Sequence, residues 1–332
     1  MNIESTHEIA VYAGYISDTQ KLKQSASGGI ATALSVEIIK KGGYVVGVTY
    51  SDDFHKAQYI ITNKISDLEK LKGSKYIEVD RSSIYKEVKN LLDNDNLVLF
   101  TGLPCTIAAL NKFLPKEYSN LITCELVCHG PTSQQVHLEY VNYLEKKYNS
   151  TLSNFTVRYK KYGWTPSYLR AEFKNGKVFE KEFSNTEYGY AFKIYGKPSC
   201  YNCQFKGNNR TGDMMIGDFW GATNRDAFWN KDGVSSIFVH TEKANNLIRS
   251  LDNIKLFETT FEQAVKSNPM VVKSKVLASN RDKFEKMFNE KGLIYAVHNT
   301  QTTSFKIKKA IKSIIPKKTI PYFKKIYKLV KK

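Results

Sequence analysis

The sequence predicts an α/β (α+β) fold: a mixed, largely parallel sheet flanked by helices, with an inserted antiparallel aromatic-rich region and a basic C-terminal helical tail. Residues 97–100 form a fully apolar segment between helical patterns, which is typical of a central strand covered by helices. From residue 151 onward the segments become longer, aromatic and alternating, as antiparallel strands are. Residues 302–332 contain eleven lysines and no carboxylate.

The composition is that of a globular protein without a membrane span. The 332 residues are 42% hydrophobic, enough for the core of one large α/β domain or two small ones. No stretch approaches the roughly 20 apolar residues of a membrane span, and the polar, acidic start after Met1 is unlike a signal peptide. We therefore expect a cytoplasmic protein. Most of the net charge of +18 comes from the eleven tail lysines, so the body is only mildly basic.

The first hundred residues alternate between strand and helix signals. Ile30, Leu34 and Ile38 are spaced as one face of a helix, and Gly42-Gly43 ends it. A serine at position 66 is suited to cap a short helix. In chain order we expect a strand at 11–16, a helix at 30–41, a strand at 44–50, a short helix at 66–71, a helix at 82–92 and a strand at 97–100.

Two of the predicted strands end in chemically distinctive loops. The strand at 97–100 leads into Thr101-Gly102-Leu103-Pro104-Cys105 and a helix through residue 114, and a strand at 121–127 leads into Cys128-His129-Gly130-Pro131. Open α/β sheets bind ligands outside the carboxyl ends of their strands, so we expect both loops at a functional site. The antiparallel region follows at 155–159, 169–173 and 178–183, with Asn175-Gly176 as a hairpin turn.

The five cysteines lie at positions 105, 124, 128, 200 and 203. They are too few and too unevenly spaced for a disulfide-stapled secreted protein, so their clustering indicates metal chemistry. The Cys200-x-x-Cys203 spacing can aim two thiolates at one metal, although a structural zinc site or a redox dithiol uses the same spacing. Cys105 and Cys128 complete a set of four thiolates from distant segments. Cys124 should be a buried, inert thiol on a core face.

Two loops have the composition of a cofactor site. Ser25-Ala26-Ser27-Gly28-Gly29 precedes a helix and offers amides, hydroxyls and a helix dipole to an anion, although the same residues are ordinary helix caps. Gly73-Ser74-Lys75-Tyr76 combines a turn, a hydroxyl, a cation and a ring, which suits a phosphate and a planar group; the alternative is an exposed polar loop. His129 is a candidate proton donor or a structural histidine. Large aromatic residues lie beside glycine in Gly163-Trp164 and Gly217-Asp218-Phe219-Trp220-Gly221. They could form a flat wall against a cofactor ring or belong to the hydrophobic core.

In combination and order, these motifs resemble the coenzyme F420 hydrogenase/dehydrogenase beta-subunit family. The resemblance runs over residues 10–245 and implies FAD and a 4Fe-4S cluster, with electrons passing between cluster, flavin and a two-electron substrate. It implies that the cluster ligands are Cys105, Cys128, Cys200 and Cys203. It also implies flavin contacts at Ser27, Gly28, Gly29, Gly73, Ser74, Lys75, Tyr76 and Gly102.

The resemblance suggests three parts: a flavin-binding part at 1–95, a cluster-binding part of the same domain at 96–300, and a basic amphipathic tail at 301–332. The sequence departs from the family pattern in two places. Many relatives begin with a ferredoxin-like module, whereas here no cysteine precedes residue 105, so we expect an external electron donor such as a ferredoxin or a partner subunit. Ala26 stands where a second serine is common, which removes one phosphate contact.

We therefore expect an iron-sulfur flavoprotein oxidoreductase. Similar bacterial proteins occur among surface-polysaccharide biosynthesis genes, which suggests a sugar-linked or envelope-related reduction, and the resemblance does not make coenzyme F420 the substrate. Two alternatives stay open: a non-catalytic electron-transfer subunit of a larger dehydrogenase complex, and a binding module whose cysteines hold structural zinc. An iron-sulfur cluster would give a brown protein and zinc a colourless one.

The tail carries apolar residues at helical spacing among its lysines. One set precedes Pro316 and a second follows it, which suits helices lying at a membrane surface with lysines near anionic headgroups. A solvated basic tail or a helix packed on a partner protein fits the same pattern. We expect peripheral contact at the inner face of the membrane as one of these alternatives, and no nucleic-acid partner, because no aromatic-lined reading surface is evident.

Overall fold

The computed structural model describes residues 8–207, 210–266 and 268–301. The chain forms two compact units, Met1–Ala278 and Ser279–Lys332. In the second unit the described residues form helix α10 (Arg281–Thr300), whose backbone leaves helical geometry at Gly292. The predictions made for the lysine-rich tail lie outside the described residues. The rest of this section concerns the first unit.

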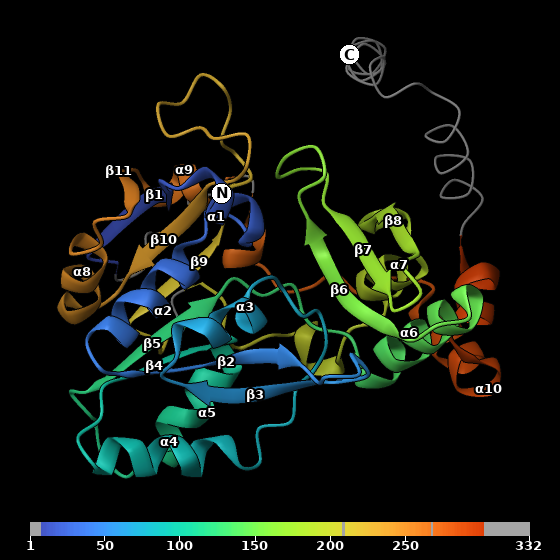
Figure 1. The fold of residues 1–332 in the computed structure, drawn as a ribbon, viewed down its shortest axis with the longest axis horizontal. Coiled ribbons are helices and arrows are strands. Elements are labelled where there is room, and N and C mark those ends of the chain that lie inside the picture. Colours follow the sequence, from blue (N-terminus) through green and yellow to red (C-terminus); the bar gives the residue numbers. More distant parts are fainter. Residues whose placement is uncertain (1–7, 208–209, 267, 302–332) are drawn as a thin grey trace. The chain divides into compact units, whose positions relative to one another are not determined.

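An eight-stranded mixed sheet forms the centre of the first unit (Figure 1). In pairing order its strands are β11 (Ile254–Glu258), β1 (Ala10–Ile16), β10 (Ser235–Val239), β9 (Met214–Asp218), β5 (Leu121–Leu126), β4 (Val98–Gly102), β2 (Tyr44–Tyr50) and β3 (Ala57–Thr62). The pairings between β2, β4, β5 and β9 are parallel, and the outer pairings are antiparallel. The predicted mixed sheet is confirmed, with its parallel part at the centre.

The central strands end at the same edge of the sheet. Strands β4 and β5 are buried and pair in register, with Gly102 opposite Glu125, and β5 pairs in parallel with β9. Parallel strands bring their carboxyl ends together, so the loops after Gly102, Leu126 and Asp218 lie side by side. The prediction that the loops following residues 100 and 127 lie after the carboxyl ends of sheet strands is confirmed.

Successive residues of a strand point to opposite faces of the sheet, so the apolar strands need cover on both faces. Helices provide that cover. The helices of the first unit outside the small sheet are α1 (Thr19–Gln24), α2 (Ile30–Lys40), α3 (Leu68–Leu71), α4 (Ile84–Asp93), α5 (Pro104–Phe113), α8 (Glu242–Arg249) and α9 (Phe261–Val265). On one face α2 and α8 pack in a single apolar core, to which Leu34 and Ile248 belong. On the other face α4 and α5 share one core and α1 and α9 another. Each fully buried aliphatic side chain contributes about 1.5–3 kcal/mol.

A small antiparallel sheet lies beside the large one (Figure 1). It consists of β6 (Leu152–Tyr159), β7 (Tyr168–Phe173) and β8 (Val178–Glu182), with helices α6 (Gln134–Tyr148) and α7 (Glu187–Ile194) in the same region. The predicted hairpin is present, with Gly176 at a φ of 80° between β7 and β8. An ion pair of 2.7 Å between Arg158 on β6 and Asp218 on β9 links the small sheet to the large one. No helix in the described residues has the length and apolar character of a membrane span.

Candidate functional site

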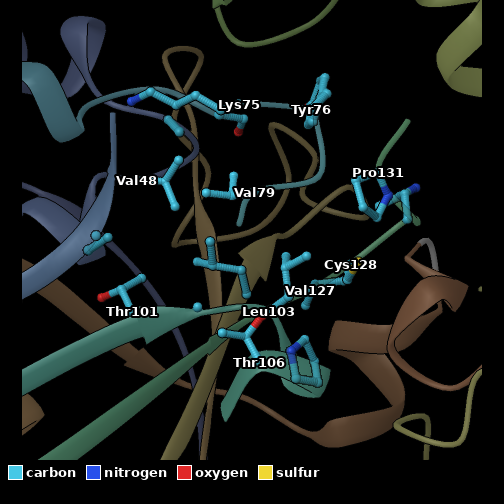
Figure 2. Close-up of a pocket in the computed structure, with 18 of the residues that line it drawn as sticks. Val48, Lys75, Tyr76, Val79, Thr101, Leu103, Thr106, Val127, Cys128 and Pro131 are labelled. Carbon is cyan, nitrogen blue, oxygen red and sulfur yellow. The ribbon is translucent and has the colours of Figure 1, made fainter. Parts of the chain in front are cut away.

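A cavity of about 1040 Å³ opens at the carboxyl edge of the central strands. The ends of β4, β5 and β9 contribute Thr101, Leu126 and Gly217 to its lining. Figure 2 shows the loop with Lys75 and Tyr76 on one side of this space. Residues from β4, α5 and the segment after β5 lie opposite. A volume of this order is at the upper end of the range for small-molecule and cofactor sites.

Four of the five cysteines lie on one part of the lining, which we call the thiol wall: Cys105, Cys128, Cys200 and Cys203. They come from three segments of the chain. Cys105 is in the first turn of α5 after Pro104, and Cys128 follows β5. Cys200 ends a short 3-10 helix (Pro198–Cys200), and Cys203 lies in the loop beyond it. The structure therefore brings together the four thiols that the sequence singles out.

The thiols of this wall interact electrostatically with one another. Burial, with smaller contributions from the neighbouring Cys105 and Cys200, raises the pKa of Cys128 to about 11. The pKa of Cys200 is also raised, first by burial and then by Cys105 and Cys203. The amide of Gly130 donates a hydrogen bond of 3.3 Å to Cys128 Sγ, which lowers the cost of a thiolate there. Burial therefore favours neutral thiols on this wall, whereas a bound metal would deprotonate them.

Cys124 differs from these four. It is fully buried in the core beneath α2, and burial raises its pKa far above the ordinary value. This is the buried, inert thiol that the strand pattern predicts. Among the described residues, no group of three or more His, Cys, Asp or Glu side chains is arranged to hold a single metal ion.

Two lysines lie beside the thiol wall. Lys275 Nζ donates to the carbonyls of Gly130, at 3.4 Å, and of Phe192. Lys206 Nζ donates to the carbonyls of Cys128 and Met270. Burial lowers the pKa of Lys275 to about 8 and also lowers that of Lys206. No sequence motif marked either residue, because isolated lysines in polar loops usually face solvent.

The opposite lining contains residues 26–29 and 73–76, which we call the loop wall. Ser27 has a φ of 50°, and its hydroxyl donates to the Val234 carbonyl at 2.9 Å. The Gly28 amide donates to Ser235 Oγ at 2.9 Å, and a Cβ at Gly28 would lie 2.2 Å from the Gly14 carbonyl oxygen. Ser27 and Gly29 line the cavity, whereas Gly28 packs behind it. The glycine is therefore required for close approach of the loop to the sheet.

Lys75 is buried within its own loop. Its Nζ donates to the carbonyls of Lys70 and Lys72, each at 2.9 Å, and of Gly73 at 3.4 Å. Burial lowers the pKa of Lys75 to about 7. In Figure 2 the side chain extends away from Cys128. The ammonium group therefore closes the turn that presents Ser74 and Tyr76 to the cavity.

An aromatic side of the cavity contains Tyr76 and Trp220. The Tyr76 ring stacks on Phe192 with centroids 4.5 Å apart, and the Trp220 ring stacks on buried Trp164 at 5.0 Å. Arg158 connects them, because its guanidinium lies over the Trp220 ring and donates to Tyr76 Oη at 3.3 Å. Sequence reasoning noted the tryptophans but missed Arg158, whose partners all lie far away along the chain.

His129 lines the cavity next to the thiol wall. Burial lowers its pKa to about 4, and the positive charge of Lys206 contributes. The imidazole is therefore neutral near pH 7 and can accept a proton. Gly73, Ser74 and Gly102, predicted from the sequence, also line the cavity.

Comparison with known families identifies the family of the chain. Two family models of the coenzyme F420 hydrogenase/dehydrogenase beta subunit match the chain, the model of its C terminus at residues 95–264 and the model of its N-terminal part at residues 11–85. The chain belongs to this family. The resemblance noted from the motifs is confirmed, and the family places the chain among subunits of oxidoreductases.

A solved structure shows the same fold. It is a chain of the F420-reducing NiFe hydrogenase complex from Methanosarcina barkeri, with 17% sequence identity and a TM-score of 0.55. The alignment covers 86% of this chain and 94% of that chain. No curated protein matches this chain.

Proposed function

We propose that this chain is an iron-sulfur flavoprotein oxidoreductase. In this proposal Cys105, Cys128, Cys200 and Cys203 hold a 4Fe-4S cluster, and FAD occupies the cavity beside it. The observation that carries the proposal is that four thiols from three separate segments converge on one wall of a cavity large enough for a cofactor. Family membership supports it, because the family consists of hydrogenase and dehydrogenase subunits.

The thiol wall fits an iron-sulfur cluster in two respects. Four thiols match the ligand set of a 4Fe-4S cluster, and the Gly130 amide supplies the kind of N–H to sulfur hydrogen bond that tunes such clusters. A four-iron cluster also accepts thiolates more widely spaced than those around one zinc ion, because its irons stand at separate corners. When bound, the cluster exchanges single electrons and the flavin exchanges one or two.

The cavity lining supplies positions for a flavin. The loop wall presents Ser27 and Gly29 at the start of α2, where the helix dipole favours phosphate oxygens. Tyr76 and Trp220 offer flat rings on the aromatic side. Apolar side chains such as Val79 and Val127 limit the access of water (Figure 2). Neutral His129 is the residue we propose to accept or return a proton at this site.

The test is anaerobic purification of the full chain with analysis of iron, sulfide and flavin. We expect a brown protein that retains flavin and whose visible absorption bleaches on reduction. Reoxidation would then be followed with coenzyme F420 and with sugar-linked compounds, because similar proteins occur among polysaccharide genes. A colourless protein that contains zinc would contradict the proposal. Reoxidation by a partner protein alone would assign the chain to electron transfer within a complex.

A further inference from the structure

Two cations lie beside the thiol wall: Lys275 is buried, and Lys206 is half-buried. The Lys275 side chain passes between two glycines: its Cδ would lie 3.2 Å from a Cβ at Gly130 and 2.8 Å from one at Gly196. The whole residue is only 8% exposed. Larger residues at either glycine would collide with this lysine. The chain is therefore shaped to hold an ammonium group at this position.

Neither lysine has a carboxylate partner among the described residues. The groups whose deprotonated form raises the pKa of Lys275 are Cys200 and Cys128. Cys128 and Cys203 act in the same way on Lys206. A buried ammonium group without a negative partner is unfavourable, so negative charge on the thiol wall would stabilise the charged form of both lysines.

We propose that Lys206 and Lys275 are the counter-charges of the metal centre on the thiol wall, and that they raise its reduction potential. This inference rests on the proposed function. Reduction adds one electron, supplied by the external electron donor, and no bond to either lysine forms or breaks. Because the ammonium groups are held in a poorly solvated region, their attraction to the added negative charge is weakly screened. They therefore stabilise the reduced state more than the oxidised state.

Lys197 provides a matched control on the same wall. It lines the cavity and lies three residues before Cys200. Its side chain is 46% exposed, and it is paired with Glu78. A charge in that setting is screened by water and by its partner, so its loss should affect the metal centre little.

The experiment is a redox titration of the full-length protein, followed by electron paramagnetic resonance, for the wild type, Lys275→Met, Lys206→Met and Lys197→Met. We expect Lys275→Met and Lys206→Met each to lower the equilibrium constant for one-electron reduction by about tenfold. This corresponds to a reduction potential that is lower by about 59 mV. Lys197→Met should lower it by less than about twofold. Equal shifts in all three variants, or none in any, would overturn the inference.

Two further outcomes are distinguishable. A wild-type protein without iron refutes the proposed function itself, whereas a wild-type cluster with unchanged potentials in Lys275→Met and Lys206→Met refutes only the role of the lysines. If only one of Lys275→Met and Lys206→Met loses its iron, the reduction potential of the other variant tests the inference. If both lose it, Lys275→Arg and Lys206→Arg must keep iron and a potential near that of the wild type. Loss of iron in those charge-retaining variants would also overturn the inference.

Discussion

The thiol wall and the loop wall enclose the same cavity, but their polar groups have different partners. On the thiol wall a hydrogen bond reaches a reactive atom, from the Gly130 amide to Cys128 Sγ. On the loop wall the Ser27 hydroxyl, the Gly28 amide and the Lys75 ammonium all bind groups of the protein itself. The thiol wall thus presents its side chains to the cavity, whereas the polar groups of the loop wall hold the backbone of the loops in place.

Because of this difference, substitutions on the two walls should affect ligand binding in different ways. Substitutions on the thiol wall should remove a bound group directly, because they delete a ligand. Substitutions on the loop wall should act through the shape of a turn, because the side chains brace it. The predicted effects accordingly decrease from the first wall to the second.

The largest effect is expected at the ligand cysteines. Cys128→Ala or Cys203→Ala should lose most of the iron and the visible colour, because a cluster that lacks one thiolate is labile. Cys124→Ala, which removes a thiol from the apolar core, should keep both. Iron analysis and absorption spectra of the anaerobic proteins measure this. Loss of iron in Cys124→Ala with retention in Cys128→Ala would show that the ligand assignment is wrong.

A second effect concerns the support of the thiol wall. Fully buried Glu125 pairs with Arg210, and Arg210 also donates to the carbonyls of Phe205 and Val271 near the Cys203 loop. Glu125→Gln leaves a buried cation without its partner, so the free energy of unfolding should fall by about 3–5 kcal/mol.

Urea denaturation measures that change, and Glu37→Gln is its control. Glu37 pairs with Lys41 at 3.2 Å on the surface of α2, where the same substitution should cost about 0.5 kcal/mol. Equal losses at the two sites would show that the buried pair does not brace the wall.

On the loop wall we expect a smaller effect. Lys75→Met removes the donor that holds three carbonyls of the turn, so flavin should bind about tenfold more weakly, a loss of about 1.4 kcal/mol. Cluster iron should stay unchanged. Flavin titration of the wild type, Lys75→Met and the exposed control Lys70→Met measures this. Unchanged flavin affinity in Lys75→Met would remove this loop from the site.

An effect on stability, and not on the site, is expected away from both walls, at His137. Its side chain is buried, Nε2 contacts the Phe54 carbonyl at 2.7 Å, and burial lowers its pKa to about 4. Tyr50 and Tyr188 pack against the ring, and His55 adds a repulsive charge when protonated. The unfolded state therefore binds the proton more readily than the folded state, so stability is complete above about pH 6.5 and falls toward pH 4.

Denaturation curves between pH 7 and pH 4.5 measure this loss for the wild type and His137→Phe. The wild type should lose about 2 kcal/mol from this group across the window, and the variant should lose less. A variant with the same pH dependence as the wild type would assign the acid sensitivity to other groups.

The sequence was informative where residue type alone dictates chemistry or periodicity. The strand at 44–50 and the helix that begins at Ile30 have strong apolar patterns, and both occur as predicted. The four cysteines were identifiable because few other roles suit them. Gly28 was singled out as part of a loop that offers free amides to an anion, but the pattern could not show that its amide binds Ser235, which lies more than 200 residues later.

Other elements were missed for physical reasons. Helix α6 buries His137 and Tyr140, residues that a hydrophobic pattern counts as polar, so no helix was predicted there. Strand β10 is fully buried but contains Ser235 and Ser236, which weaken a strand signal. No local sequence pattern marks Arg158, Lys206 and Lys275, because the residues that they contact lie far away along the chain.

The most direct test of the central claim is the metal and sulfide content of the anaerobically purified full-length chain, measured together with Cys124→Ala and Cys128→Ala. The four-thiol site predicts four iron and four sulfide per chain in the wild type and in Cys124→Ala, with both largely lost in Cys128→Ala. One zinc per chain, with no sulfide and no visible absorption, would contradict it.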